Sequence, residues 1–147
     1  YKYFLTPKGI AEKSRLTYIH LQNFTNLYRV ARRDFQTLFN HLYKSGVKRV
    51  VFCGLDEVTE IAYLSLQEVD INLAAVADDE SNGKIFFENK IISLEDVKGL
   101  DHDMAVITSF RLGDEIQQKL TDIGIDKNKI CNISKGGWLK KIEHLKI

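Results

Sequence analysis

Two different hydrophobic periods divide the chain, and the change between them falls at Ser45-Gly46. Before this point, apolar or small residues recur at alternating steps of four and three, the spacing of a coiled-coil seam. A second apolar line widens the stripe, so we expect one long helix that packs both on its own domain and on a partner subunit. The seam consists of Ile10, Ser14, Thr17, Leu21, Phe24, Tyr28, Ala31, Phe35, Leu38 and Leu42, and the second line of Leu27, Val30, Phe39 and Tyr43.

The alternative is that the whole stripe covers a single intramolecular core. Thr6-Pro7 is a helix start, since threonine caps well and proline suits the first turn. A break between Asn23 and Asn26, where Asn and Thr are weak helix formers, would give two helices and favour this alternative.

Short apolar runs alternate with amphipathic helices after Gly46. Strands that are apolar at consecutive positions and separated by helices imply a parallel sheet covered on both faces. The expected fold class is therefore α/β, a small doubly wound parallel sheet of order 3-2-1-4-5 preceded by a long N-terminal helix. The expected strands are Arg49 to Cys53, Leu73 to Ala77, the extended pieces Lys84 to Phe87 and Ile91-Ile92, Met104 to Ser109 and Ile130 to Ile133. Helices are expected from Glu57 to Val69, from Gly113 to Ile123 and from Gly136 to Ile147, and a further helix is expected to begin at a capping box at Ser93.

Length and composition indicate one compact globular domain with an appendage. The chain has 147 residues, of which 44% are hydrophobic. We divide it into residues 1–46, half of a hairpin with the linker or dimerisation helix, and residues 47–147, a Rossmann-like ligand-binding domain. The net charge of +1 gives no overall case for binding nucleic acid or an anionic membrane. Because the sequence has neither a run of ~18 apolar residues nor a signal pattern, we expect a cytoplasmic protein without membrane contact.

The cysteines and histidines show no metal or disulfide pattern. In the expected strand order, one strand separates Cys53 from Cys131, roughly 10 Å and too far for a disulfide. Both are interpreted as small buried hydrophobes. The four histidines, His20, His41, His102 and His144, lack metal-ligand spacing.

Gly54 ends the first strand and opens a helix, as in nucleotide-binding α/β domains. Such domains carry G-x-G-x-x-G, but Asp56 and Thr59 occupy the second and third glycine positions here. Asp56 and Glu57 put carboxylates at a helix amino terminus, where they either cap the helix or face a ligand, and where they would repel a pyrophosphate. Asp78 ends the second strand, the place of a ribose-binding acid, or else caps a turn.

Thr108 and Ser109 end the strand that begins at Met104, and Arg111 follows it. All three are expected at the same crevice, where hydroxyls and a guanidinium could bind an anion or a sugar. No nucleophile elbow, Walker loop, HExxH or Tyr-x-x-x-Lys pair occurs, so we expect a binding site rather than a catalytic one. The alternative is an enzyme or enzyme subunit acting on a nucleotide sugar, with Asp56, Glu57 or His102 in a catalytic role.

Two stretches of the chain resemble known families. YKYFLTPKGIAEKSRLT, Tyr1 to Thr17, resembles the end of the wing and the next helix of MarR-type winged-helix transcription regulators, with their "Y-x-L-T-x-K-G" stretch. Val50 to Phe110 looks like the small Rossmann-type domains found ahead of sugar O-acyltransferases and in CoA- or nucleotide-binding regulators, apart from its missing later glycines. These resemblances imply the C-terminal part of a bacterial transcription regulator that forms a homodimer through the N-terminal helix, contacts DNA through an upstream domain and binds a small metabolite, such as a nucleotide or nucleotide sugar.

Overall fold

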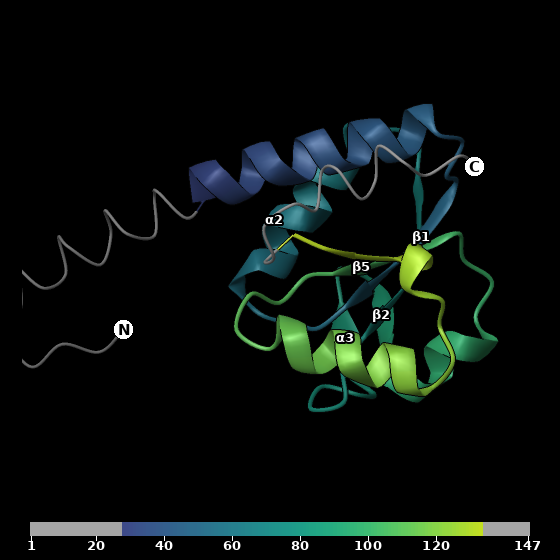
Figure 1. The fold of residues 1–147 in the computed structure, drawn as a ribbon. Coiled ribbons are helices and arrows are strands. Elements are labelled where there is room, and N and C mark those ends of the chain that lie inside the picture. Colours follow the sequence, from purple (N-terminus) through teal and green to yellow (C-terminus); the bar gives the residue numbers. More distant parts are fainter. Residues whose placement is uncertain (1–27, 134–147) are drawn as a thin grey trace, which may run out of the picture.

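The computed structural model describes residues 28–133, which form a mostly parallel, six-stranded sheet with helices on both faces (Figure 1). The expected α/β class is confirmed. The strands are β1 (Arg49–Cys53), β2 (Asn72–Ala77), β3 (Ile85–Phe86), β4 (Asn89–Ile92), β5 (Met104–Ile107) and β6 (Ile130–Asn132).

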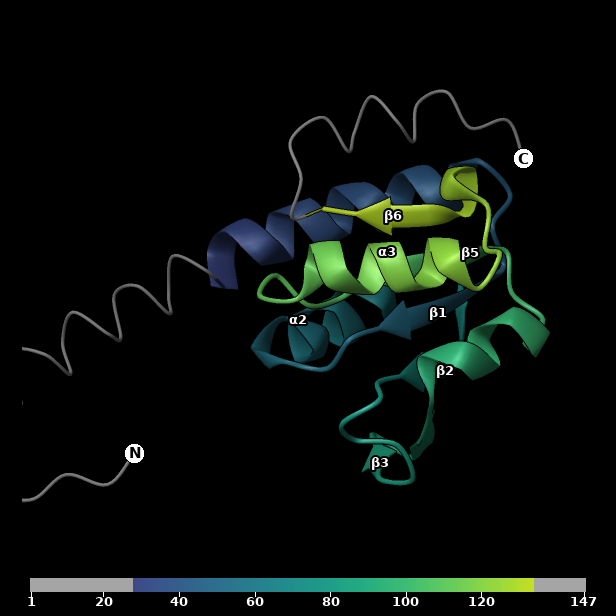
Figure 2. The same ribbon diagram turned by 60° about the horizontal axis from the view of Figure 1, so that its bottom comes forward.

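The spatial order of the strands is β3-β4-β2-β1-β5-β6. The five parallel strands follow the expected 3-2-1-4-5 order, with β4 in third place. The expected order has places for five strands; β3, which lies in the extended piece expected from Lys84 to Phe87, adds a sixth strand that pairs antiparallel with β4 at the edge of the sheet. Phe87 and Glu88 join the two with positive φ angles of 44° and 68°, which two-residue hairpin turns require. This hairpin projects from the body of the domain (Figure 2).

Helices lie close to their expected positions. Residues 28–44 are helical, and α2 (Glu57–Leu66) and α3 (Gly113–Asp122) follow β1 and β5. The segment after Ser93 is a 3-10 helix, η1 (Leu94–Gly99), and a second, η2 (Lys127–Lys129), precedes β6. The expected Ser93 capping box was wrong, since the Ser93 side chain makes no cap bond; Asp79 Oδ1 accepts from the Leu94 amide at 2.9 Å instead.

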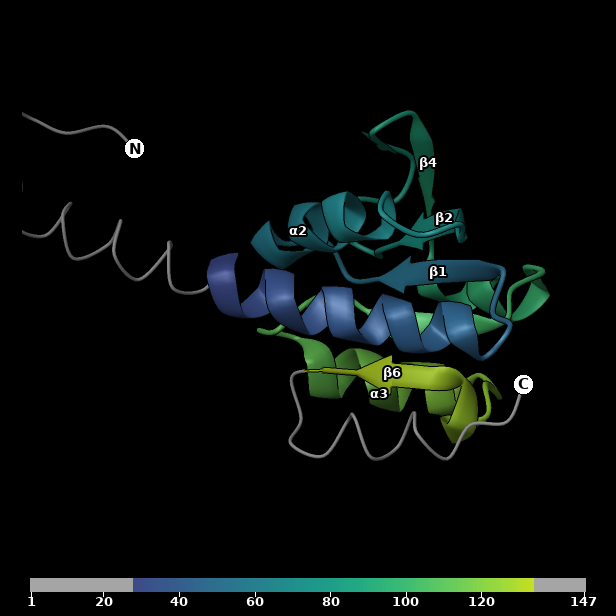
Figure 3. The ribbon, with the colours of Figure 1, turned by 90° about the horizontal axis from the view of Figure 1, so that it is seen from above.

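Side chains alternate between two cores along each strand. Val50 and Phe52 of β1 face the core beneath residues 28–44 and α2, while Val51 and Cys53 face the core beneath α3 and η1. This alternation explains why the strands are apolar at every position. Figure 3 shows residues 28–44 lying alongside α2 on the first face.

The seam of the N-terminal helix packs on the sheet of its own chain from Ala31 to Leu42. Its seam members there are fully buried, and Phe35, Phe39 and Phe52 of β1 stack with ring centroids 5.8 and 6.0 Å apart. The expected intramolecular packing is thus confirmed, whereas pairing with a second subunit stays a prediction. The Thr6-Pro7 start, the Asn23 to Asn26 break and the helix at 136–147 lie outside the described residues.

The two cysteines behave as expected. Cys53 on β1 and Cys131 on β6 are buried and form no disulfide, and β5 separates their strands. Over residues 28–133, no helix is both long enough and apolar enough to cross a membrane.

Candidate functional site

Strand register brings three of the expected site residues to one point. Cys53 pairs with Ala77 on one side and with Ile107 on the other, so the next residues, Gly54, Asp78 and Thr108, lie side by side at the carboxyl edge. The pairing extends past the strands, because Gly54 N donates to Ala77 O at 2.8 Å. In open α/β sheets, ligands bind at this edge.

Gly54 makes the tight turn that its position predicts. Its φ of +97° is one that side-chain-bearing residues rarely adopt, and a Cβ there would lie 2.6 Å from Ile116 Cδ1 and 2.8 Å from Ser109 Cβ. The Gly54 carbonyl oxygen accepts hydrogen bonds from two buried hydroxyls, that of Thr108 at 2.6 Å and that of Thr59 at 3.1 Å. Thr59, interpreted from the sequence only as a missing glycine, is therefore part of the turn.

Asp78 ties two loops together. Its Oδ1 accepts from the Leu55 amide at 3.3 Å and its Oδ2 from the Ser81 amide at 3.0 Å. The turn-capping role of Asp78 is thereby confirmed. Its side chain is half-buried, which leaves it within reach of a ligand as well.

Asp56 caps the amino terminus of α2, which is one of the two roles expected for it. Its Oδ1 accepts from the Val58 amide at 2.8 Å, and Thr59 Oγ1 accepts from the Asp56 amide at 2.9 Å. Glu57 occupies the first helical position and is exposed. Both carboxylates complement the positive end of the helix dipole.

Five of the six backbone amides from Gly54 to Thr59 are hydrogen-bonded within the protein. Those of Gly54, Leu55, Asp56, Val58 and Thr59 each have an acceptor, respectively Ala77 O, Asp78 Oδ1, Thr59 Oγ1, Asp56 Oδ1 and Asp56 O. A dinucleotide-binding turn presents such amides to the pyrophosphate. The donors present here do not fit that group.

An open groove of about 460 Å³, called here the α2 groove, lies beside the helix amino terminus. Arg111 is exposed on the rim of this groove, where its guanidinium is accessible to an anion, and Phe110 lines the groove beside it. Ser109 is buried and accepts from the Leu112 amide at 3.1 Å, so it shapes the turn rather than the groove. The groove is lined by Leu55, Asp56, Glu57, Val58, Phe110 and Arg111.

A second, smaller hollow of about 210 Å³, the α3 groove, lies on the other side of the turn. Lys119 bonds to Asp79 across it, which lowers the pKa of the Asp79 carboxyl and raises the pKa of the Lys119 ammonium. Sequence analysis assigned neither residue to a site: Lys119 lies on the amphipathic α3, and Asp79 follows Asp78 in the loop after β2. The groove is lined by Asp78, Asp79, Glu80, Leu94, Leu112, Glu115, Ile116 and Lys119.

The opposite, amino edge of the sheet carries a further hollow of about 590 Å³, lined by Tyr43, Lys44, Gly46, Val47, Lys48, Asp70 and Asn72. It is larger but contains none of the expected site residues. His102 precedes β5 at this edge, where its Nδ1 lies 2.7 Å from Leu100 O. The structure therefore separates His102 from Asp56 and Glu57, with which the enzyme alternative grouped it. Within residues 28–133, no cluster of three or more potential metal ligands occurs.

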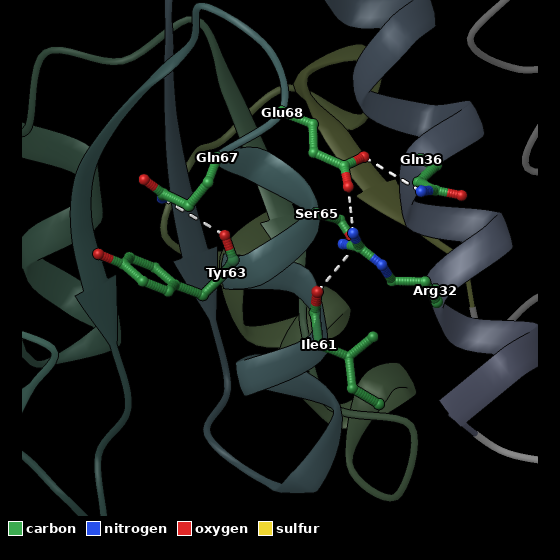
Figure 4. Close-up of polar contacts among 7 residues, drawn as sticks. All are labelled: Arg32, Gln36, Ile61, Tyr63, Ser65, Gln67 and Glu68. Atoms are coloured by element: carbon green, nitrogen blue, oxygen red, sulfur yellow. Dashed lines mark hydrogen bonds and ion pairs between the residues drawn. The ribbon is translucent and has the colours of Figure 1, made fainter. Parts of the chain in front are cut away.

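The far end of α2 is bonded to the N-terminal helix (Figure 4). Arg32 Nη1 donates to Ser65 Oγ at 2.9 Å, and its Nη2 pairs with Glu68 Oε1. Gln36 Nε2 donates to the other Glu68 oxygen at 3.1 Å. One helix thus begins at the candidate site and ends against residues 28–44.

Comparison with protein families places most of this fold in a described family. The family described as C2185-like, N-terminal, matches residues 46–131, more than half of the chain. The chain therefore belongs to this family. No curated protein matches it.

Proposed function

We propose that this member of the C2185-like family is the ligand-sensing and dimerisation portion of a bacterial transcription regulator. In this proposal it acts in the cytoplasm, binds a small metabolite at the carboxyl edge, pairs with a second copy through its N-terminal helix and reaches DNA through an upstream domain. Nucleotides and nucleotide sugars are the ligand class that its resemblances suggest.

The observation that carries the proposal is the placement of α2. Its amino terminus forms a wall of the α2 groove through Asp56, Glu57 and Val58. Its last turn is bonded to Arg32 of the N-terminal helix through Ser65, and Glu68, just after α2, is bonded to Gln36. A ligand changes an equilibrium only if it binds the two states with different affinity. A ligand in the α2 groove contacts α2, against which the N-terminal helix packs. Its affinity can therefore depend on the position of the N-terminal helix.

Dimerisation is tested on the chain itself by light scattering. The seam predicts a homodimer that Leu21→Glu dissociates, because a carboxylate is costly to bury in an apolar seam. Gln22→Glu, which adds the same charge beside the seam, is the matched control and is expected to leave the dimer intact. A monomeric wild-type chain would contradict the pairing.

Sensing is tested on the natural full-length protein. Immunoprecipitation of bound chromosomal DNA is expected to enrich discrete sites, and a metabolite that raises the Tm of the protein is expected to change that enrichment. Arg32→Ala should keep ligand binding but lose the effect on DNA, whereas Arg33→Ala, on the same helix with a side chain 73% exposed, should keep both. Conversion of the metabolite into a product would instead support the enzyme alternative.

A further inference from the structure

We infer that the ligand of the α2 groove is a zwitterion with an apolar side chain, of the class of the apolar α-amino acids. In this arrangement the carboxylate of the ligand pairs with Arg111 and its ammonium with Glu57. Its apolar group packs on Leu55 and Phe110. This inference rests on the proposed sensing function and names the ligand class of that same site. It departs from the nucleotides that the resemblances suggest.

Two loops that leave the sheet toward opposite faces form the α2 groove. Its lining consists of residues 55–58, which follow β1, and residues 110–111, which follow β5. β1 and β5 are neighbours in the sheet, yet α2 packs on the core of one face and α3 on the core of the other. Open α/β sheets bind their ligands where the strand order reverses in this way. The position of the groove therefore indicates a binding site independently of its chemistry.

A phosphate finds few donors in this groove. The backbone amides of Gly54, Leu55, Asp56, Val58 and Thr59 are hydrogen-bonded within the protein. Two carboxylates and one guanidinium line the groove, and this balance opposes a ligand with several negative charges. Recognition of a ligand therefore falls to the side chains.

Two opposite charges line the groove without pairing with each other. Glu57, at the first position of α2, and Arg111 are both exposed, and neither forms an ion pair within residues 28–133. The other carboxylate, that of Asp56, already accepts from the Val58 amide. A ligand with one positive and one negative group matches Glu57 and Arg111 together, because a carboxylate accepts from an ammonium and a guanidinium binds a carboxylate. A ligand with a single charge leaves one of the two side chains without a partner.

The remaining lining of the groove is apolar. Leu55 and Phe110 are half-buried, and Val58 is buried beside them. Removing the exposed part of these side chains from water favours an apolar group on the ligand, and the ring of Phe110 suits an aromatic one. The volume of about 460 Å³ lies within the roughly 300–1,000 Å³ of small-molecule pockets. The groove therefore has room for an amino acid whose side chain is large and apolar.

Calorimetry on the full chain tests this inference with the apolar L-amino acids and with nucleoside diphosphates. Two analogues of the tightest-binding amino acid are added, one without the ammonium and one without the carboxylate; for phenylalanine these are hydrocinnamate and phenethylamine. At least one amino acid is expected to bind, and both analogues are expected to bind at least about tenfold more weakly, as the loss of one hydrogen bond between charged groups predicts.

Three results would overturn the inference. An analogue that binds within this factor of the amino acid would show that the ligand need not be a zwitterion. Failure of every amino acid to bind would contradict the ligand class. A nucleoside diphosphate that binds more tightly than any amino acid would contradict it as well.

Two neutralising variants assign the contacts. Arg111→Gln is expected to weaken the amino acid about tenfold and to leave the analogue without a carboxylate unchanged. Glu57→Gln is expected to weaken the amino acid similarly and to leave the analogue without an ammonium unchanged. The matched controls are Glu60→Gln, an exposed carboxylate further along α2 and outside the groove, and Arg33→Gln, on the N-terminal helix. Both controls are expected to bind the amino acid as the wild type does. Equal weakening of the amino acid and both analogues by Arg111→Gln or Glu57→Gln would overturn the assigned contacts.

Failure of this inference is distinguishable from failure of the proposed function. A nucleotide that binds and changes DNA enrichment would overturn the amino-acid class and leave the sensing function intact. Absence of dimerisation or of DNA enrichment would overturn the proposed function, whichever compound binds.

Discussion

The hydroxyl of Thr108 donates a hydrogen bond of 2.6 Å to the carbonyl oxygen of Gly54. Both residues are buried, and they follow neighbouring strands, β5 and β1. The contact joins the two loops that the strand order places on either side of the crevice. The turn at this edge is therefore held by the protein's own polar groups, and its integrity can be measured separately from any ligand.

Thr108→Val keeps the shape of the side chain and removes this donor. We expect a loss of about 1–2 kcal/mol in the free energy of unfolding, since Thr59 still reaches the Gly54 carbonyl. Urea denaturation measures the change. Thr37→Val, at a hydroxyl on the exposed side of the N-terminal helix, is expected to stay within about 0.5 kcal/mol. Equal losses from both variants would show that the Thr108 hydrogen bond contributes no more to the free energy of unfolding than an exposed one.

Gly54→Ala is expected to destabilise the fold by about 2–4 kcal/mol, combining the cost of a left-handed alanine with overpacking against Ile116 and Ser109. Gly83→Ala is the matched control. Gly83 has a similar φ of +89°, but its Cβ would meet no atom within 4 Å, so only the conformational cost of about 1 kcal/mol applies. Thermal or urea unfolding of the two variants should therefore differ, and a tie would disprove the close packing over Gly54.

Phe35→Ala tests whether the N-terminal helix belongs to the domain core. Phe35 is fully buried and stacks on Phe39, so truncation should cost about 3–5 kcal/mol. Tyr43→Ala removes an aromatic ring from the same helix at a position that is 51% exposed, and is expected to cost far less. A small effect at Phe35 would mean that the helix is an appendage, independent of the sheet.

The ion pair between Asp79 and Lys119 predicts a dependence of stability on pH. The bond to Lys119 lowers the pKa of the Asp79 carboxyl from its ordinary 3.8, so the carboxylate stabilises the fold above that value. This contribution is lost as the pH falls through the lower, folded-state pKa. Because the pKa of Lys119 is raised from 10.5, its contribution is present below that pH and lost as the pH rises further.

Unfolding measured between about pH 2 and pH 5 should therefore show a smaller acid loss in Asp79→Asn than in the wild type. Lys119→Gln is expected to reduce the acid loss similarly, since it removes the ammonium whose hydrogen bond is the main cause of the lowered Asp79 pKa. An unchanged pH profile in both variants would show that the pair does not persist in solution.

The thiol of Cys53 is expected to be unreactive in the folded protein. Complete burial raises the pKa of the thiol, so the reactive thiolate is scarce at neutral pH, and the side chain is inaccessible to reagents. Thiol titration should detect neither Cys53 nor the buried Cys131 in the native chain and both after denaturation. Rapid native labelling would mean that the sheet opens readily.

Much of the fold could be read from local patterns. Runs such as Val50 to Cys53 are apolar on both faces, which only a sheet covered on both sides accommodates, and the intervening helices make that sheet parallel. The hairpin of β3 and β4 was only partly foreseen, because its turn consists of Phe87 and Glu88 rather than the Asn and Gly that usually supply positive φ angles.

The sequence by itself determined where Gly54, Asp78 and Thr108 would meet, since parallel strands in register end at the same edge. It did not determine what these residues do there. Whether an aspartate caps an amide or a hydroxyl closes on a carbonyl depends on atoms that lie 23 to 54 residues apart in the chain, so only the tertiary structure decided it. A comparable distance in sequence separates Arg32 from Ser65, and for the same reason the link between the N-terminal helix and α2 had no local signature.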